Sequence, residues 1–421
     1  MKIRSQSQLN LFLIIAGAIT LAFLVINYIN MGVFLNSESL SATYLFGDYF
    51  SHMGYSSLGD GIYAATQDAC LPPLAYCCYY LLWRMAPSYT NSAEIFWEDF
   101  KNSDNTALVF LMMNLVLVIL LIWIILQYFR RYDGKYILAL PIIILFSYPC
   151  MFTSLQRGNS ALAVALLLAI VWLWLDDKSA VKREVALILI AVATGFKIYP
   201  AILGIVLIKR KDWKAVLRLI IYGAILFFGP FVFYGGVEGI KTFFETMFSI
   251  TQWTGVDHYG TVRGMSIYLL REHTALTAAQ AESAGYVLET LFLVASLSFF
   301  FLAKRKWEEV ILLSAILVSY VGSNAHYTFA YYIPALLMFL RENESNGLFG
   351  EHGSAGGSGD ADRRKNGGFL ASLGITLITV MFAIIFSCPF FWPKGIYMGV
   401  SVAGYCMWCL TVFEVILVRR K

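Results

Sequence analysis

Charged residues are scarce in this chain of 421 residues. Only 14% are Asp, Glu, Lys or Arg, whereas 59% are hydrophobic and 16% aromatic, and the mean hydropathy is +0.68. Soluble globular domains carry about 25% charged residues, so this composition excludes an ordinary soluble domain and predicts an all-α polytopic membrane protein. The net charge of +4 is what basic loops on one side of a membrane produce, and it gives no reason to expect nucleic acid as a partner.

The sequence also lacks the pattern of a metal centre. It has seven cysteines and five histidines. Cys406 and Cys409 have the spacing of a metal-binding pair, but no second pair or histidine cluster accompanies them, and a structural zinc site needs four ligands. In an apolar segment free cysteine behaves as a small hydrophobic residue. We expect neither a metal nor a cofactor.

Long apolar runs fill most of the chain. About 20 apolar residues cross a bilayer, and the candidate segments are 9–29, 71–86, 106–128, 136–155, 160–175, 184–208, 215–235, 286–303, 309–324, 327–340, 369–388 and 395–417. The first run is long and no small-residue cleavage site closes it, which indicates an uncleaved span rather than a signal peptide. We expect roughly 10–12 transmembrane helices in a single integral membrane domain, residues 1–421.

Basic clusters orient the second half of the chain. Cytoplasmic loops are rich in Lys and Arg, so Lys209–Lys211 and Lys304–Lys306 predict cytoplasmic turns. These turns place the long 236–284 loop outside. They place residues 341–368, which are basic and rich in Gly and Ser, inside as a flexible linker. The closing basic residues, 419–421, are also predicted to be inside.

The first half allows two arrangements. If every candidate segment crosses once, both chain ends are inside, but Arg130–Arg131 and Lys182–Arg183 lie outside. In the second arrangement 71–86 does not cross fully and 184–208 is a pair of half-helices, broken near Gly195 and Pro200, so that both clusters lie inside. Lys197 then lies near the outer face. We favour the second arrangement.

One stretch between apolar segments contains no basic residue at all. Residues 32–70 have no Lys or Arg, which is typical of a non-cytoplasmic loop. Its carboxylates are Glu38, Asp48, Asp60 and Asp68. A carboxylate held at a membrane surface is a candidate general base, and we favour Asp48, which two aromatic residues follow, over the ordinary role of a solvated loop acid. Asp60 lies in a Gly-Asp-Gly turn and is more typical of a structural residue; Asp68 fits either role.

Three basic side chains lie in or beside apolar segments. They are Lys197, Arg157 and His326. A cation within an apolar segment is costly and marks a functional site by default, and the planar fork of arginine suits phosphate oxygens. Each also has an ordinary interpretation: Lys197 can snorkel to the interface, Arg157 can be a plain loop residue, and His326 can be a satisfied interface histidine. We favour a phosphate-facing role for the three.

The second external loop, 236–284, has no predicted fold of its own. Loops of roughly 50 residues tend to be functional. Its aromatic and charged residues can cap a substrate cleft or can anchor the loop at the membrane interface, and both interpretations stay open. These residues are Trp253, Asp257, His258, Tyr259 and Arg263.

Several short motifs follow one another between about residue 45 and residue 340. They are Asp48-Tyr49, Gly59-Asp60-Gly61-Ile62-Tyr63, Pro72-Pro73-Leu74, Arg157-Gly158-Asn159, the element Phe196 to Pro200, and Ser323, His326, Tyr327 and Pro334. Together they resemble the GT-C superfamily of polyprenyl-phosphate-sugar-dependent glycosyltransferases, and within it glycosyltransferase family 87 (GT87), a group of bacterial mannosyltransferase-like proteins. The element Phe196 to Pro200, followed by a basic turn, is the most specific. The chain departs from the family at Asn324-Ala325, where relatives often have Trp before the His.

The resemblance implies a GT-C fold and an inverting glycosyltransferase in the plasma membrane of a bacterium, with its active site on the outer face. Its donor is a polyprenyl-phosphate-linked hexose, commonly mannose, and its acceptor a hydroxyl of a lipid-linked or cell-envelope glycan. Asp48 becomes the catalytic base. The resemblance assigns the donor phosphate and sugar to Lys197, Arg157, His326, Asn159, Tyr63 and Tyr199, and leaves as acceptor or cleft residues Asp60, His258 and Arg263.

Physical chemistry agrees with a lipid-linked donor. Nucleotide sugars are absent outside the membrane, so a lipid must deliver the sugar there. The predicted external segments contain no Asp-x-Asp metal motif. A leaving monophosphate needs no divalent cation where basic side chains neutralise it.

Two other functions remain open. A transporter or flippase typically has broken helices in matching halves, and this chain has a broken helix near Gly195 to Pro200 without a counterpart in its second half. A surface-glycan polymerase or ligase would carry basic and histidine residues in the large external loop, where this chain has Arg263, Arg271, His258 and His273. Turnover of defined polyprenyl-phosphate sugars separates the three classes.

Overall fold

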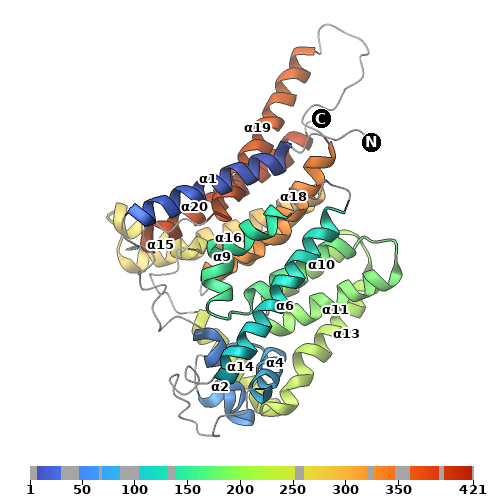
Figure 1. The fold of residues 1–421 in the computed structure, drawn as a ribbon, viewed down its shortest axis with the longest axis vertical. Helices are drawn as coiled ribbons and strands as arrows, with labels where there is room; N and C mark the ends of the chain where they lie inside the picture. The colour runs from blue at the N-terminus through green and yellow to red at the C-terminus, as the bar shows by residue number, and fades with distance from the viewer. Residues whose placement is uncertain are drawn as a thin grey trace.

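In a computed structural model the protein is described over residues 7–29, 47–65, 69–85, 104–130, 138–251, 260–320, 326–346, 361–387 and 393–419. In these ranges all regular structure is helical, without a strand. The longer helices (Figure 1) are α1 Ser7–Ile29, α2 Gly47–Ser56, α4 Pro73–Met85, α6 Asp104–Tyr128, α8 Ala139–Phe146, α10 Ala161–Trp174, α11 Ala180–Phe196, α12 Gly204–Lys209, α13 Trp213–Phe228, α14 Gly236–Thr251, α15 Val262–His273, α16 Ala278–Leu302, α17 Lys306–Ser319, α18 Ile333–Asn346, α19 Ala361–Ile385 and α20 Pro393–Arg419. The short turns are η2 Gly59–Gly61, α3 Ile62–Ala65, α9 Tyr148–Cys150, η3 Met151–Leu155 (a π-turn), η4 Tyr199–Leu203, η5 Gly229–Phe233 and η6 His326–Tyr332.

Among the described residues, four helical segments are long and apolar enough to cross a membrane by length and composition. They are Asn105–Tyr128, Trp213–Phe233, Ala278–Leu302 and Val400–Leu417. Large apolar side chains such as Leu115 and Ile119 of α6 are more than half exposed, at 58% and 57%, which suits contact with hydrocarbon and not with water. The expectation of an all-α polytopic membrane protein is confirmed, whereas the count of roughly 10–12 spans stays a prediction.

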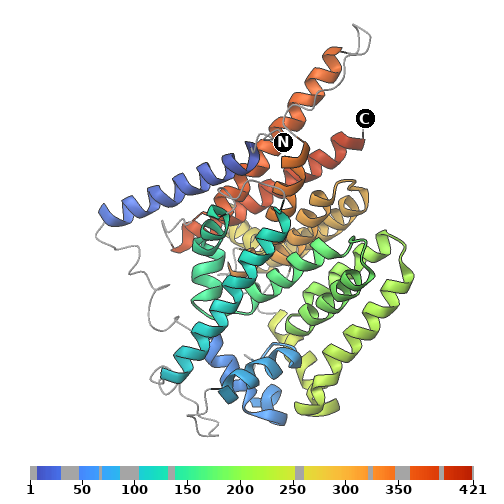
Figure 2. The same cartoon turned by 45° about the vertical axis from the view of Figure 1, so that its right-hand side comes forward.

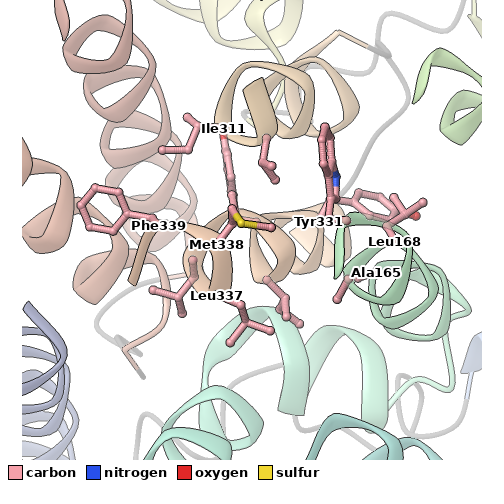
Figure 3. Packing of buried hydrophobic residues seen from close by; sticks show 14 of the residues in the cluster. Ala165, Leu168, Ile311, Tyr331, Leu337, Met338 and Phe339 are labelled. Atoms are coloured by element: carbon pink, nitrogen blue, oxygen red, sulfur yellow. The ribbon is translucent and has the colours of Figure 1, made fainter. Parts of the chain in front are cut away.

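The largest hydrophobic core lies where α10, α17, η6 and α18 meet. Figure 3 shows Leu168 of α10, Ile311 of α17 and Tyr331 of η6 gathered around Leu337 and Met338 of α18, and all five are buried. A helix that is hydrophobic all round belongs in such an interior. This core fixes α10 and η6, which border the candidate site described below.

The predicted segment 184–208 is broken, as the second arrangement required. Helix α11 ends at Phe196, Lys197 has extended backbone, and Pro200 lies in the first turn of η4. A proline lacks the N–H that would continue the preceding helix. The chain then returns, because Arg210 at the end of α12 pairs with Asp176 (2.5 Å), which lies just before the start of α11.

One described residue from each basic cluster of the first half, Lys182 and Arg130, lies towards that same end. Lys182 at the start of α11 pairs with Asp177 (2.9 Å). Tyr128, two residues before Arg130, donates to the carbonyl of Ala169 (2.7 Å) in the second half of α10. Helix α4 has only 13 residues, about 20 Å at 1.5 Å per residue, and is short for a full crossing. The geometry agrees with the second arrangement.

The predicted span 136–155 does not form one continuous helix. Helix α8 ends at Phe146, Ser147 has extended backbone (ψ 154°), and α9 and the π-turn η3 follow. Pro149 cannot donate to a carbonyl one turn earlier, so the first helix stops there. The resulting turn carries the chain into residues 156–160, which enter the candidate site.

The second loop and the linker contain more helix than expected. The 236–284 loop holds α14, α15 and the first turns of α16, and residues 252–259 lie outside the described part. Within the predicted linker 341–368, α18 continues to Asn346 and α19 begins at Ala361. In both views (Figure 1, Figure 2) the blue segments 47–65 and 69–85 lie beside the yellow-green α14, at the opposite end of the molecule from the orange α19.

Candidate active site

Helix α2 carries Asp48 in its first turn, where the positive end of the helix dipole favours a carboxylate. The buried face of α2, with Tyr49, Phe50 and Met53, packs into a second hydrophobic core that is rich in aromatic rings from α4, η5 and α14. Asp48 therefore lies on a packed helix, where the sequence suggested a loop. Helix α2 is outside the four long apolar segments.

A tight turn at residues 156–160 meets the start of α2. The Tyr49 N–H donates to the Arg157 carbonyl (3.0 Å), and the Tyr79 hydroxyl donates to the Gly158 carbonyl (3.2 Å). Gly158 has φ +72°, and a Cβ there would lie 2.4 Å from the Tyr49 Cβ. Only glycine permits this backbone conformation and this approach without strain. The close contact brings the side chains of Arg157 and Asn159 to Asp48.

Both carboxylate oxygens of Asp48 accept hydrogen bonds. Arg157 donates from Nη2 (2.6 Å) and Nε (3.2 Å) to Oδ1, and Asn159 donates from Nδ2 to Oδ2 (2.7 Å). The Asn159 amide is itself oriented, because its Oδ1 accepts from the Ala161 N–H (2.9 Å) at the start of α10. The Arg157 side chain is 35% exposed and that of Asp48 15%, so a ligand can reach the pair.

These contacts keep Asp48 ionised. Burial by itself raises the pKa of the Asp48 carboxyl, but the charge and hydrogen bonds of Arg157, with a smaller contribution from Asn159, outweigh it. The net effect is a pKa below the ordinary value of an aspartate. The carboxylate is thus available as an acceptor at neutral pH, but Arg157 must loosen before Asp48 becomes a strong base.

Lys197 lies at the break between α11 and η4, and the residue is 7% exposed. Its Nζ is 4.6 Å from the centre of the Tyr327 ring, a cation–π contact that partly replaces lost hydration. The structure thus joins three of the expected site residues, Asp48, Arg157 and Asn159, by hydrogen bonds. A fourth, Lys197, comes from a separate part of the chain and lies within electrostatic range of Asp48.

His52 is a member of this site that the sequence reasoning missed. It lies on α2 one turn after Asp48, and residues four apart share a helix face. Burial lowers the pKa of His52 to about 4; the charge of Asp48 opposes this effect, and the charges of Lys197 and Arg157 add to it. The spacing from Asp48 was the available signal, once a helix at 47–56 was recognised.

The hydroxyls of Tyr63 and Tyr199 have protein partners. Tyr63 donates to the Leu71 carbonyl (3.0 Å), which holds the segment before α4, and Tyr199 and Tyr331 share a hydrogen bond of 3.1 Å. Both tyrosines therefore have structural contacts near the site. Their role in donor binding stays a prediction.

Asp60 and Arg263 lie in other contacts. Asp60 accepts from the Gly235 N–H (3.1 Å) and so ties η2 to the start of α14, which is the structural role its turn sequence favoured. Buried Arg263 lies 3.9 Å from Glu289 and stacks over the ring of Tyr286. Neither is joined to Asp48 by a described contact, and their place in an acceptor cleft stays a prediction.

The side chains of two expected site residues, His326 and His258, lie outside the described part of the structure. His326 begins η6, one residue before Tyr327, but its side chain lies outside the described residues. The loop residues Trp253, Asp257, His258 and Tyr259 lie outside them entirely. Within the described ranges no three His, Cys, Asp or Glu side chains are grouped as metal ligands would be, and the expectation that no metal or cofactor takes part stays a prediction.

Comparison with known proteins adds one match. The family model for glycosyltransferase family 87 matches residues 103–325, more than half of the 421 residues. The matched range includes Arg157, Asn159 and Lys197, begins after Asp48, and ends just before His326. No curated protein and no solved structure matches the chain.

Proposed function

The chain belongs to glycosyltransferase family 87, and from this we propose that it transfers a hexose, with mannose as the first candidate, from a polyprenyl-phosphate donor to a hydroxyl of a lipid-linked or cell-envelope glycan. The observation that carries the proposal is the contact of Asp48 with Arg157 and Asn159 beside buried Lys197. One carboxylate and two cations are what a single displacement at a sugar phosphate requires.

The distribution of charge supports an active site on the outer face. Lys182, Arg210 and Lys306 pair with Asp176 or Asp177 at the end of the molecule away from Asp48. Basic residues mark the cytoplasmic side of membrane proteins. An outer-face site favours a lipid-linked donor, because nucleotide sugars are confined to the cytoplasm.

The reaction follows from the roles of these residues. The acceptor oxygen attacks the anomeric carbon, the bond from that carbon to the phosphate oxygen breaks, and its electron pair leaves with the phosphate. Asp48 takes the proton of the acceptor hydroxyl and releases it to solvent after transfer. One displacement inverts the anomeric centre, and the leaving phosphate needs no proton from a general acid, unlike the leaving oxygen in glycoside hydrolysis.

Arg157 and Lys197 stabilise the charge that develops on the phosphate. Because the Arg157 side chain is 35% exposed, a donor phosphate can compete with Asp48 for the guanidinium. Each hydrogen bond that Arg157 gives up raises the pKa of Asp48 and makes it a better base. Donor binding thus activates the carboxylate.

Turnover by the purified full-length protein in lipid nanodiscs tests the proposal. A panel of polyprenyl-phosphate hexoses is offered with glycolipid acceptors, and products are identified by mass spectrometry. We expect Asp48→Asn to lower turnover at least about 10²-fold, the lower part of the range for loss of a general base. Glu238→Gln, which changes an exposed acid on α14, is the matched control and should leave turnover unchanged.

Any of three results contradicts the proposal. Asp48→Asn protein that turns over at the wild-type rate removes the assigned base. If wild-type protein moves the intact lipid-linked sugar across a bilayer without forming a new glycosidic bond, it is a transporter. If it adds preassembled blocks of several sugars to the product, it is a polymerase or ligase.

A further inference from the structure

His52 is placed in the candidate site by geometry, but the proposed reaction assigns it no role. It shares a face of α2 with Asp48, four residues earlier in the helix. Its imidazole packs among three tyrosine rings, with centroid distances of 5.2 Å to Tyr79, 5.8 Å to Tyr76 and 6.0 Å to Tyr55. The tyrosines hold the ring in place and leave its polar atoms to other partners.

Neither ring nitrogen of His52 has a hydrogen-bond partner among the described residues, and Nδ1 is fully enclosed. The residue as a whole is only partly buried, so it is not sealed off from a ligand. Polar atoms in this position are normally satisfied in native proteins, and exceptions often mark a functional site. A neutral imidazole offers one donor and one acceptor, and the low pKa of His52 keeps it neutral at pH 7.

The chemistry around His52 defines its ligand. Lys197 and Arg157 both act on the ring electrostatically, so the ring lies within electrostatic range of the cations that would hold the donor phosphate. The group attached to that phosphate is the transferred sugar. The neutral imidazole can both donate and accept a hydrogen bond, and this suits a sugar hydroxyl, which can do the same.

We propose that His52 is a substrate-contacting residue whose imidazole hydrogen-bonds a ring hydroxyl of the transferred sugar. This inference rests on the proposed function. His52 thereby contributes to the choice of sugar, because a site built to bond a hydroxyl rejects analogues that lack it.

Three variants separate this contact from simple packing. His52→Phe keeps a ring among the tyrosines, His52→Gln places an amide near the position of Nε2, and His52→Asn places one near Nδ1. We expect His52→Phe to lower kcat/KM for the donor at least about tenfold, the effect of one hydrogen bond worth about 1.4 kcal/mol. At least one amide variant should recover most of that loss. His52→Phe activity equal to or above that of both amide variants overturns the proposal.

A cycle with deoxy sugars identifies the hydroxyl. Polyprenyl-phosphate donors lacking one hydroxyl at a time are compared in wild-type protein and in His52→Phe. Removal of the contacted hydroxyl should lower kcat/KM about tenfold in wild-type protein and cause no further loss in His52→Phe. If removal of each hydroxyl lowers kcat/KM by the same factor in both proteins, the proposal is overturned. A loss confined to the KM of the acceptor also overturns the assignment to the donor sugar.

The same variants are scored without assuming a donor. In cells that lack the native protein, the glycan product restored by His52→Phe, His52→Gln and His52→Asn is measured by mass spectrometry and normalised to folded protein. The amide variants should restore more product than His52→Phe. Wild-type protein that uses no polyprenyl-phosphate sugar defeats the proposed function alone, whereas full restoration by His52→Phe defeats the inference alone.

Discussion

At the scale of single residues, Asp48 combines two opposing requirements. Its hydrogen bonds from Arg157 and Asn159 keep the carboxylate charged in a partly buried site. The same bonds reduce its basicity, since the proton must displace donors that already occupy both oxygens. In the resting enzyme these hydrogen bonds protect the Asp48 carboxylate from protonation. In the proposed reaction the charge of the donor phosphate draws Arg157 away and makes Asp48 a stronger base.

Arg157→Gln tests this coupling. With the positive charge removed, the pKa of Asp48 in the free enzyme rises, so Asp48 becomes protonated at a higher pH and the acid side of the kcat/KM profile moves to higher pH. The measurement is kcat/KM for the donor across the acid range, because this ratio reports the free enzyme, in which Arg157 contacts Asp48. Arg218→Gln, which disrupts an ion pair with Glu184 on another part of the molecule, is the control. If the acid side of the pH profile lies at the same pH in Arg157→Gln and in wild type, the pKa of Asp48 does not determine it.

His52 gives a prediction for stability. Its pKa is lowered from 6.5 to about 4 by burial, so between these values the unfolded chain binds a proton that the folded protein does not. Stability therefore falls as pH decreases from 6.5 towards 4. Thermal unfolding in detergent should show a smaller decrease in Tm over this window for His52→Phe than for wild type.

The control for that prediction is an exposed histidine. His273, at the end of α15, is exposed, so His273→Phe should keep the wild-type dependence of Tm on pH. Identical slopes for wild type and His52→Phe would count against the buried, neutral state of His52.

At the scale of elements, the site depends on one contact between α2 and the turn before α10. The two meet through the Tyr49 N–H and the Arg157 carbonyl, and Gly158 makes this possible. Asp60 supports the same region from the other side by fixing η2 to the start of α14. The break after Phe196 gives Lys197 extended backbone, and the charge of Asp48 acts on the Lys197 side chain. The elements therefore position charges that no single helix could bring together.

Gly158→Ala should disrupt this contact. Alanine at φ +72°, with its Cβ 2.4 Å from the Tyr49 Cβ, must shift the turn or α2, which we expect to cost about 2 kcal/mol or more. Turnover should fall at least about tenfold, because displaced catalytic groups lose their alignment. Gly17→Ala in α1, where an added Cβ meets nothing within 4 Å, is the control. Equal Tm and turnover in both variants would refute the role of Gly158.

At the scale of the whole molecule, charge is sorted to two ends. One end has Lys209 with Glu309, and Arg210 and Lys306 with Asp176. The other end has the Asp48 site, α4 and α14. Between them lie long apolar helices with lipid-suited side chains. A membrane protein with this arrangement is expected to keep its basic end in the cytoplasm.

Labelling from one side of the membrane tests this orientation. Glu238→Cys on α14 and Lys178→Cys before α11 place thiols at exposed positions at opposite ends. In intact cells a membrane-impermeant maleimide should label Glu238→Cys and leave Lys178→Cys unlabelled until the cells are lysed. Wild-type protein measures labelling of the native cysteines. The reverse pattern would place the Asp48 site in the cytoplasm and rule out the proposed outer-face reaction.

Local sequence was sufficient for several features and insufficient for others. Asp48, Arg157 and Lys197 were identified because isolated charges beside apolar runs are costly and therefore conspicuous. The break near Pro200 was predictable from the missing N–H of proline. The helix at 47–56, the break after Phe146 and the helices within 236–284 were missed, because each short helix depends on packing against distant elements.

The sequence by itself determined the class of protein, its main apolar segments and the identity of its charged site residues, since composition, proline positions and the cost of buried charge act along the chain. Only the tertiary structure decided the pairing of Asp48 with Arg157 and Asn159, which lie 109 and 111 residues away, and the position of His52 beside them. Contacts at such separations depend on how helices pack, and a sequence pattern of short range does not contain that information.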